Sequence, residues 1–405
     1  MAKIDDSVKK KVPELRFPGF TDDWEERKLS DIVVRLTKSS NNNQLPKVEF
    51  EDIIAGEGRL NKDISRKFDD RKGTLFEPDN ILYGKLRPYL KNWLFSDFKG
   101  IALGDFWVFK SINSEPKFVY SLIQADNYQR VANDTSGTKM PRSDWKKVSS
   151  SNFSIPTSLE EQQKIGSFFK QLDNTIALHQ RKLDMLKEQK KGYLQKMFPK
   201  NGAKVPELRF AGFADDWEER KLGEIAPLRG GFAFKSSNFR NSGVPIVRIS
   251  NILSSGEVGG DFAYYDEQNN DDKYILPDKS AVLAMSGATT GKVSILSQTD
   301  DEKVYQNQRV GYFQSVDYID YGFISTIVRS ELFMMQLESV LVAGAQPNVS
   351  SKEIDSFEFM IPKLIQEQQK IGSFFKQLDD TIALYQRKLD LLKEQKKGFL
   401  QKMFV

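Results

Sequence analysis

Basic and amide side chains gather in short segments that also carry aromatic residues. In the first half of the chain they are Lys85, Arg87, Tyr89 and Lys91 in YGKLRPYLK, and Thr138, Lys139 and Arg142 in GTKMPR. In the second half they are Arg248 and Asn251 in VRISNI, Thr289 and Lys292 in ATTGKV, Gln306, Asn307, Gln308 and Arg309 in YQNQRV, and Gln346 and Asn348 in GAQPNV. Arginine can pair with guanine and Asn or Gln with adenine, while lysine mostly contacts phosphate. As sets they indicate nucleic-acid contact; for each residue alone, a solvated polar side chain is an equal alternative.

Sequence patterns that would indicate catalysis match their motifs less well than these segments match nucleic-acid contact. The segment GATTGKV at 287–293 resembles a phosphate-binding loop, but it has three residues between its glycines and Val293 where a magnesium-binding Ser or Thr is required. Adenine methyltransferases hold the target amino group with an (N/D)PP(Y/F) element, and the chain contains no Pro-Pro. We therefore expect neither a nucleotide site nor autonomous methylation by that route.

A loose nuclease pattern occurs twice. Pro277-Asp278 with Asp301-Glu302-Lys303, and Pro78-Asp79 with Glu115-Pro116-Lys117, match the PD...(D/E)xK form of metal-dependent nucleases. Such a match arises easily in a chain with 29% charged residues. Both Pro-Asp pairs also stand at a turn before an apolar strand, which explains them structurally. We expect no catalytic residue and no metal site in this chain.

The composition of the chain excludes several further classes of protein. The chain of 405 residues has no cysteine and one histidine, which excludes disulfides and cysteine nucleophiles and disfavours imidazole chemistry. No apolar run approaches the roughly 18 residues of a membrane span, and Met1–Lys11 is too polar for a signal peptide. These features fit a cytoplasmic protein.

Charge is distributed unevenly along the chain. Region A (30–156) has 20 Lys+Arg against 16 Asp+Glu, and region B (223–362) has 11 against 18. A uniformly basic surface is thus excluded, and any polyanion must meet local patches. The acidity of region B argues against a strong autonomous affinity of that region for DNA.

Two segments of the sequence are duplicated. Positions 161–198 and 367–404, both beginning EQQKIGSFFKQLD, agree at 34 of 38 residues. The opener VPELRFPGFTDDWEERKL at 12–29 returns at 205–222 with 16 of 18 identities. The chain therefore has the order opener, region A, helix, opener, region B, helix.

The duplicated helix carries apolar residues at the a and d positions of a heptad repeat. The predicted seam comprises Ile165, Phe169, Leu172, Ile176, His179, Leu183 and Leu186 in one copy and Ile371, Phe375, Leu378, Ile382, Tyr385, Leu389 and Leu392 in the other. Each helix would be about 57 Å long and needs a partner for its narrow stripe. Antiparallel packing of the two copies is favoured because it relates the two halves by a pseudo-two-fold axis. A parallel or an intermolecular coiled coil is the alternative.

Polar residues at the seam favour structural roles. His179 stands where the other copy has Tyr385, so we expect it to pack or set the register rather than to act chemically. Lys190 and Lys396 also fall on the seam, where a long stem can cover apolar surface while the ammonium reaches water. They more plausibly fix the register, or contact a partner, than bind a ligand.

Regions A and B share a frame although their sequences are almost unrelated. Each has a Pro-Asp turn before an apolar strand, and each ends with a Gly-containing loop, a Ser-rich run and a strand closing on Ile-Pro. We predict an α+β protein: two mixed α/β, strand-rich domains held apart by a long antiparallel two-helix coiled coil, with an internal pseudo-two-fold repeat. The predicted boundaries are 1–157, 158–200, 201–362 and 363–405.

The whole order resembles the specificity subunit of a bacterial type I restriction-modification enzyme. The resemblance rests on the opener ending WEERKL, the EQQKI helix, their repetition, NILYGKLRPYLKN and DFKGIALGDFWVF in region A, and GFAFKSSNFRNSGVPIVRISNI in region B. It implies two target recognition domains that each read half of a bipartite double-stranded DNA site. It also implies that the helices act as a ruler and as a docking surface for two modification subunits.

The implied modification subunits would methylate adenine with S-adenosylmethionine, and two ATP- and magnesium-dependent restriction subunits would complete the nuclease. We accordingly expect no cofactor in this chain. Two other functions remain open at this stage: a metal-dependent DNA endonuclease that uses the Pro-Asp patterns, and a coiled-coil scaffold without sequence specificity.

Overall fold

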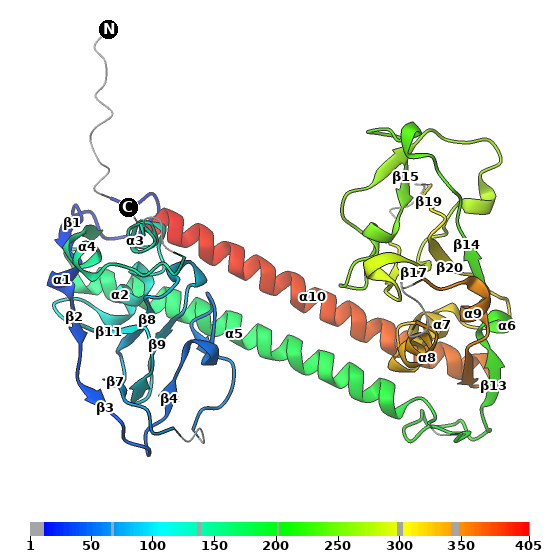
Figure 1. Ribbon diagram of the computed structural model, residues 1–405, viewed down its shortest axis with the longest axis horizontal. Coiled ribbons are helices and arrows are strands. Elements are labelled where there is room, and N and C mark those ends of the chain that lie inside the picture. The colour runs from blue at the N-terminus through cyan, green and yellow to red at the C-terminus, as the bar shows by residue number, and fades with distance from the viewer. Residues whose placement is uncertain are drawn as a thin grey trace, which may run out of the picture. The chain divides into compact units, whose positions relative to one another are not determined.

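The computed structural model describes residues 12–65, 69–135, 139–200, 202–297, 303–341 and 348–404. It divides into two compact units. The first unit comprises Met1–Lys182 and Tyr385–Val405, and the second comprises Leu183–Leu384. Among the described residues, no helix combines the length and apolarity needed to cross a membrane. Figure 1 gives the element labels used below.

The first unit is built mainly from short strands, with the helices α2, α3 and α4 directly before its closing strand. In chain order its elements are β1 (Glu25–Lys28), α1 (Leu29–Ile32), β2 (Val33–Leu36), β3 (Ser39–Ser40), β4 (Lys47–Val48), η1 (Phe50–Asp52), β5 (Ile53–Ile54), β6 (Arg59–Leu60), β7 (Gly73–Phe76), β8 (Ile81–Gly84), η2 (Pro88–Leu90), β9 (Trp93–Phe95), β10 (Gly100–Ala102), β11 (Phe106–Ser111), α2 (Pro116–Leu122), α3 (Asp126–Ala132), α4 (Trp145–Ser150) and β12 (Asn152–Ile155).

The central sheet of the first unit has the antiparallel order β2-β11-β8-β9. A second sheet has the order β3-β7-β10-β4, and β1 pairs with β12. In β8 and β11 successive side chains point to opposite faces of the central sheet. Both faces are covered, which explains why these strands read as continuous apolar runs rather than as alternating ones.

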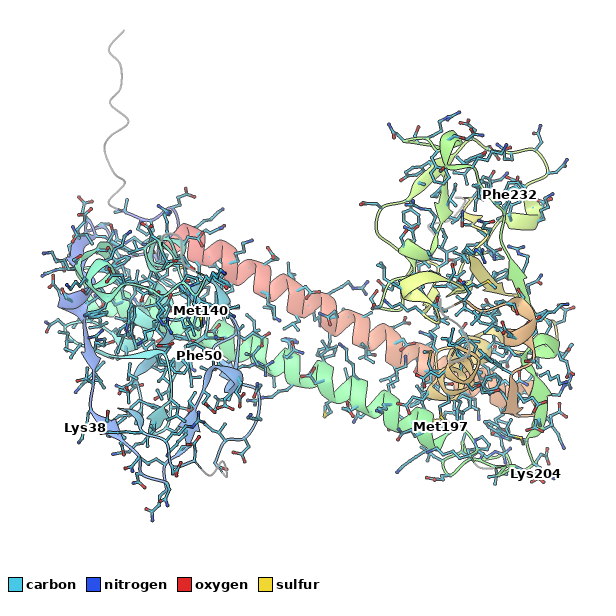
Figure 2. The ribbon with its side chains drawn as sticks, in the orientation of Figure 1. Lys38, Phe50, Met140, Met197, Lys204 and Phe232 are labelled. Carbon is cyan, nitrogen blue, oxygen red and sulfur yellow. The ribbon has the colours of Figure 1, made fainter. Side chains whose placement is uncertain are left out.

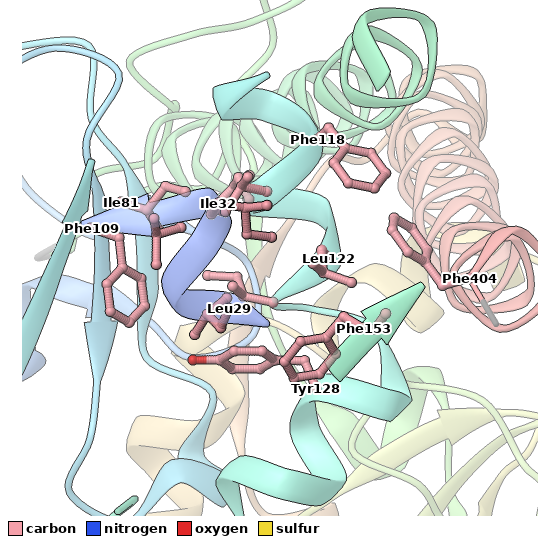
Figure 3. Packing of buried hydrophobic residues seen from close by; sticks show 14 of the residues in the cluster. Leu29, Ile32, Ile81, Phe109, Phe118, Leu122, Tyr128, Phe153 and Phe404 are labelled. Carbon is pink, nitrogen blue, oxygen red and sulfur yellow. The ribbon is translucent and has the colours of Figure 1, made fainter. Parts of the chain in front are cut away.

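One face of the central sheet belongs to the larger core. Ile81, Tyr83 and Phe109 contribute to it together with the helices α1 and α2 and the end of the last long helix. Figure 3 shows Phe118 of α2 and Phe404 near each other in this cluster, and their rings stack with centroids 5.7 Å apart. The opposite face packs against a smaller cluster that includes the buried Leu82, Phe106 and Val108.

The second unit repeats this order with different residues. Its elements are β13 (Glu218–Lys221), α6 (Leu222–Ile225), β14 (Leu228–Gly230), η3 (Ser236–Asn238), β15 (Val244–Val247), η4 (Ile249–Asn251), β16 (Ala263–Tyr265), η5 (Asp272–Tyr274), β17 (Ala281–Ala284), η6 (Gly287–Thr289), β18 (Val293–Ile295), β19 (Tyr305–Gln306), β20 (Val310–Phe313), α7 (Tyr321–Ile327), α8 (Glu331–Leu341), α9 (Ser351–Asp355) and β21 (Glu358–Ile361).

The two units share the strand order of their central sheets. The order β14-β20-β17-β18 of the second unit matches β2-β11-β8-β9 of the first, and β13 pairs with β21 as β1 pairs with β12. The other sheets differ, because the second unit has the three-stranded order β16-β15-β19. The predicted common frame with different contents is therefore confirmed, as is the mixed, repeated α/β character.

The long helices are α5 (Leu159–Lys196) and α10 (Ile365–Met403), and each contributes to both units. In the first unit Phe168 contacts Phe399 with ring centroids 5.0 Å apart, and His179 contacts Tyr385 at 5.6 Å. In the second unit Tyr193 contacts Phe374 at 5.0 Å. Residue numbers rise along one helix as they fall along the other, so the pair is antiparallel in both units, as predicted (Figure 1).

Predicted seam residues are mostly covered. Those that are buried are Ile165, Phe169, Ile176, Leu183, Leu186, Ile371, Phe375 and Leu389, and those that are half-buried are Leu172, His179, Leu378, Ile382, Tyr385 and Leu392. The two seam lysines make ion pairs between the helices. Lys396 lies 2.6 Å from Asp173 in the first unit, and Lys190 lies 2.5 Å from Asp379 in the second.

The duplicated residues also fasten each opener to its helix. Glu161 is 1% exposed and accepts two hydrogen bonds from Arg16, at 2.6 and 2.8 Å, and one from the indole of Trp24. Glu367 receives the same bonds from Arg209 and Trp217. A buried carboxylate needs such partners, so the repeated opener and the repeated EQQKI segment depend on one another.

The glycine of the repeated helix permits a close approach. A Cβ at Gly166 would lie 2.5 Å from the backbone nitrogen of Phe118 at the start of α2. A Cβ at Gly372 would lie 2.6 Å from Asp320, which caps the start of α7. The start of α2 therefore packs against a position of α5 that can carry no side chain, and the start of α7 packs against the equivalent position of α10.

Candidate nucleic-acid interface

The structure joins the two predicted basic segments of region A. We call Lys85–Lys91 together with Lys139–Arg142 the first loop pair. Leu86 and Arg142 form an antiparallel bridge, and the Arg87 nitrogen donates to the Pro141 carbonyl at 2.7 Å. Segments about fifty residues apart in the sequence therefore form one surface at the end of β8. Thr138 lies outside the described residues.

The shape of this surface depends on an unusual backbone. Arg87 and Lys91 have φ values of 49° and 57°, in the left-handed region, on either side of the single turn η2. Residues other than glycine rarely adopt this conformation, and they concentrate at functional sites. The turn exposes the side chains of Arg87, Tyr89 and Lys91 together.

Asp105 organises the cations of the first loop pair. Its carboxylate lies 3.4 Å from the Lys85 ammonium and 3.1 Å from the Arg142 guanidinium. Arg142 is still half-exposed, so the carboxylate can orient the guanidinium while leaving donors free for a ligand. Sequence reasoning missed Asp105; its signal was the Gly-Asp turn within GIALGDFWVF, where Gly104 has φ +82°.

Exposed apolar side chains accompany these cations. Tyr89 is 55% exposed, Leu90 40% and Met140 48%, and Met140 is labelled in Figure 2. Aromatic and apolar groups set among basic residues can contact base faces or thymine methyl groups. Such a surface is suited to reading nucleic-acid bases as well as holding phosphates.

The second unit has a corresponding surface at the end of β17. Ser286 and Asn348 form an antiparallel bridge, equivalent to that of Leu86 and Arg142. The Met285 nitrogen donates to the Arg309 carbonyl at 3.0 Å. Residues 286–292, 307–309 and 348 thus form what we call the second loop set. Gln346 lies outside the described residues.

Side chains of the second loop set differ in their solvent exposure. Lys292, Gln308, Arg309 and Asn348 are exposed, and Asn307 and Thr289 are half-buried. Lys292 donates to the Ser254 hydroxyl at 2.8 Å, and the Thr289 hydroxyl lies 3.4 Å from the Ile249 carbonyl. Phe232, labelled in Figure 2, is 44% exposed and forms a parallel bridge with Asn307. Sequence reasoning did not single out Phe232.

Two side chains that the sequence suggested for DNA contact are buried instead. Gln306 is 0% exposed; its amide donates to the carbonyls of Arg229 and Val310, and its oxygen accepts from the Arg229 guanidinium. Asn251 is 1% exposed, donates to Gly259 and Asp261 and accepts from the Arg248 nitrogen. This geometry suits supports of the loops rather than groups that touch bases. Polar type alone could not reveal their burial.

Arg229 and Arg248 lie beside these amides. Burial lowers the pKa of Arg229, whose guanidinium lies 4.9 Å from the ring centroid of Tyr312. Arg248 is half-buried and donates to the Asp261 carbonyl at 3.0 Å. Of these two arginines, Arg248 is the one from the predicted set.

Described residues of the PD...(D/E)xK matches form hydrogen bonds and ion pairs that give them structural roles. Lys303 pairs with Glu267 and with Asp271, the latter at 3.2 Å. Glu115 caps α2 by accepting from the Lys117 and Phe118 nitrogens. Asp301 and Glu302 lie outside the described residues. Within the described part of the chain, no group of three or more His, Cys, Asp or Glu residues is arranged to hold a metal.

Solved structures resemble this fold. The S subunit of the type I restriction-modification system from M. genitalium superposes with a TM-score of 0.66 at 14% identity, covering 97% of this chain and 99% of that one. A chain from a study of complex assembly and conformational transition of a type I restriction-modification system gives 0.51 at 16% identity, covering 93% and 96%. At such identities the likeness concerns the fold.

Curated relatives and a family model extend the likeness to sequence. The MjaVIII type I restriction enzyme specificity subunit of Methanocaldococcus jannaschii is 26% identical over 312 residues, 75% of this chain and 70% of that protein. The EcoBI specificity subunit of Escherichia coli is 24% identical over 192 residues, covering 46% and 38%. The model of the type I restriction modification DNA specificity domain matches twice, at residues 21–188 and 214–394. The chain therefore belongs to the type I restriction-modification specificity family, as a non-catalytic subunit for DNA sequence recognition.

Proposed function

We propose that the two units read the two halves of a bipartite DNA site. The observation that carries this proposal is the repeated construction of the first loop pair and the second loop set. Both stand at the end of equivalent strands, β8 and β17, and both are joined by equivalent bridges. Their side chains differ, so the same frame would present two different reading surfaces.

In the first unit we assign base contacts to Arg87 and Arg142 and phosphate contacts to Lys85, Lys91 and Lys139. Arginine presents a fork of donors that matches guanine, whereas lysine acts as a point charge. Tyr89 would contact a base face, and Thr138 is a further candidate. In the second unit the proposed contacts are Arg248, Thr289, Lys292, Asn307, Gln308, Arg309, Gln346 and Asn348, with Asn251 and Gln306 as buried supports.

The proposed assembly contains two modification subunits that dock on the paired helices and methylate adenine with S-adenosylmethionine. Two ATP- and magnesium-dependent restriction subunits would join them, and the complex would act in the cytoplasm. Segments 1–157 and 201–362 would be the target recognition domains, and 158–200 and 363–405 the spacers. The family relationship supports this assignment.

The test is an exchange of region A in the chain expressed with its cognate modification subunits. Residues 30–156 are replaced by the same region of a related specificity subunit, leaving both openers and both helices intact. Genome-wide mapping of methylated adenine should then show one changed half-site and one unchanged half-site. A reciprocal exchange of 223–362 is the control and should change the other half. A change in both halves after one exchange would show that the units do not read independently.

A further inference from the structure

A cavity of about 890 Å³ opens in the first unit beside the β5–β6 hairpin. Its walls come from that hairpin, from β9, and from the parts of α5 and α10 that belong to the same unit. Trp93, Phe95 and Tyr120 line its apolar side, and none is more than 7% exposed. The site is thus a shaped concavity rather than a flat patch.

Positive charge predominates around this cavity. Its lining contains eight Lys or Arg residues and four Asp or Glu residues. Two of the carboxylates already have cations: Glu57 lies 2.7 Å from Arg59 and 3.0 Å from Lys393, and Asp173 pairs with Lys396. The Glu57–Lys393 pair joins the β5–β6 hairpin to α10, and the Asp173–Lys396 pair joins α5 to α10.

Lys62 pairs with Asp52 at 2.9 Å, but three other cations of the lining have no such partner. Lys91, Arg181 and Lys397 are exposed, and no carboxylate of the described chain lies within ion-pair distance of them. The Lys170 ammonium lies 5.5 Å from the ring centroid of Phe95 and adds a further charge. A surface with several unpaired cations converging on one concavity favours an anionic ligand.

Two further features indicate a built site. The indole Nε1 of Trp93, a residue 3% exposed, has no acceptor among the described residues, although buried N–H groups are normally paired. Gly58, with φ +64°, brings the hairpin so close that a Cβ there would overlap the Tyr120 hydroxyl. The wall is therefore held against Trp93 by a position that accepts no side chain.

The cavity is continuous with the first loop pair. Lys91 belongs to both, and its carbonyl accepts a hydrogen bond from the Gly56 nitrogen at 2.9 Å. We propose that this cavity binds phosphate groups, namely those of the DNA backbone next to the half-site read by the first loop pair. The proposal rests on the proposed function, since it places the duplex at that loop pair. Neither Arg181 nor Lys397 belongs to the base-reading set, so their contribution would be independent of sequence.

The experiment measures the salt dependence of DNA binding by the chain assembled with its modification subunits. The test variant is Arg181→Gln with Lys397→Gln. The control variant is Arg387→Gln with Lys388→Gln, which removes the same charge from exposed positions of α10 in the same unit, outside the cavity. Each phosphate contact contributes about 0.9 to the slope of log K against log salt. The test variant should therefore lower the slope by about two, while the methylated motif stays the same.

Several results would overturn the proposal. One is an unchanged slope, and another is an equal decrease in the control variant. Failure of the test variant to assemble with the modification subunits would identify the cavity as a protein-docking surface instead. Binding of ATP or pyrophosphate without DNA, abolished by the test variant while the DNA slope is kept, would identify a site for free phosphates. Loss of the half-site sequence from the methylated motif would instead contradict the proposed reading roles.

Discussion

At the scale of single residues, Arg142 gives the sharpest test of base reading. Within the first loop pair its guanidinium donates a hydrogen bond to Asp105 at 3.1 Å, and the side chain remains half-exposed. We expect Arg142→Ala to weaken binding to the first half-site by about 1–3 kcal/mol and to relax the preference at one base pair, as for loss of a bidentate contact. Arg87→Ala should behave similarly. Competition binding against duplexes changed at each position measures the effect.

Two further variants distinguish base-specific contacts from phosphate contacts that do not depend on sequence. Lys85→Ala removes the other cation beside Asp105 and should weaken binding almost uniformly across sequences. Arg27→Ala removes an exposed cation of β1 outside the loop pair and should leave binding near its original value. If Arg87→Ala, Arg142→Ala and Lys85→Ala all left binding unchanged, the DNA-reading face of region A would lie elsewhere.

A second residue-scale prediction concerns acid stability. The Tyr305 hydroxyl donates to Asp271 at 2.6 Å, and together with Lys303 it holds the pKa of Asp271 below its ordinary value. Burial, and then the bond to Asp271, raise the pKa of Tyr305 to about 12. Because the folded-state pKa of Asp271 is lowered, its stabilising contribution is present above the unfolded value of about 3.9 and is lost as pH falls below it.

The measurement is the free energy of unfolding between pH 7 and pH 2. Asp271→Asn should lower stability at neutral pH and flatten the decline below about pH 4, since the variant has no proton to gain there. Asp261→Asn changes an exposed carboxyl of the same unit and serves as the control. An identical pH profile for Asp271→Asn and the original chain would contradict the assignment.

Residue types predicted only some members of the proposed reading surface. The cations of YGKLRPYLK and GTKMPR, which the sequence presented as two separate groups, lie at one surface. Gln306 and Asn251 have equally suitable chemistry but are enclosed by the backbone carbonyls of their own unit. Asp105 was missed because an acidic residue does not indicate a polyanion site until its neighbours are known. Burial and pairing depend on contacts distant in sequence.

At the scale of elements, the duplicated helices differ in the surroundings of the same ion pair. Lys396 and Asp173 in the first unit correspond to Lys190 and Asp379 in the second. Asp379 has a further cation, Arg329, at 2.8 Å. At the equivalent position after α2 the first unit has Gln124, whose oxygen accepts from Lys396 at 2.7 Å. Burial raises the pKa of Asp173, and Lys396 opposes that rise.

This difference predicts unequal costs for the same substitution. Lys396→Met leaves the Asp173 carboxylate, whose side chain is 14% exposed, without its paired cation and should cost about 3 kcal/mol of unfolding free energy. Lys190→Met leaves Asp379 beside Arg329 in a more exposed site and should cost about 1 kcal/mol. Urea unfolding of both variants, with Lys388→Met as an exposed control, makes the comparison. Equal losses would show that Arg329 does not compensate.

The helices were predictable and the sheets were not. A heptad seam repeated over five turns or more specifies a long helix and its apolar face, and α5 and α10 extend over the predicted stretch. The short strands, several of them two to four residues long, carry no such periodicity. The order β2-β11-β8-β9 arises from pairing across more than seventy residues, which local patterns do not encode.

At the scale of the whole molecule, duplication makes each unit depend on both long helices. The first unit combines the start of α5 with the end of α10, and the second combines the remaining halves. Each opener is fastened to its own helix by the same buried carboxylate, Glu161 or Glu367. The repeated segments therefore form a constant frame, within which regions A and B can differ.

The length of that frame leads to the last prediction. If the paired helices separate the two reading surfaces, their length should set the unspecified spacer of the DNA site without affecting either half-site. Four residues added to α5 after Lys182, with four added to α10 after Leu384, lengthen the pair by about 6 Å. Both insertions lie within the predicted seam and away from the openers, and the one in α5 comes one residue after Arg181 of the cavity lining.

Duplex DNA rises about 3.4 Å per base pair, so the spacer should grow by one or two base pairs. Four residues also exceed one helical turn by about 40°, close to the rotation of about 34° between neighbouring base pairs. Four residues do not complete a heptad, so local unwinding of the seam will absorb part of the increment. A single insertion in α5 alone is the control, and it should give a smaller shift or a strained subunit. The readout is the methylated motif. A spacer of the original length, with both half-sites still recognised, would show that the helices do not set the distance.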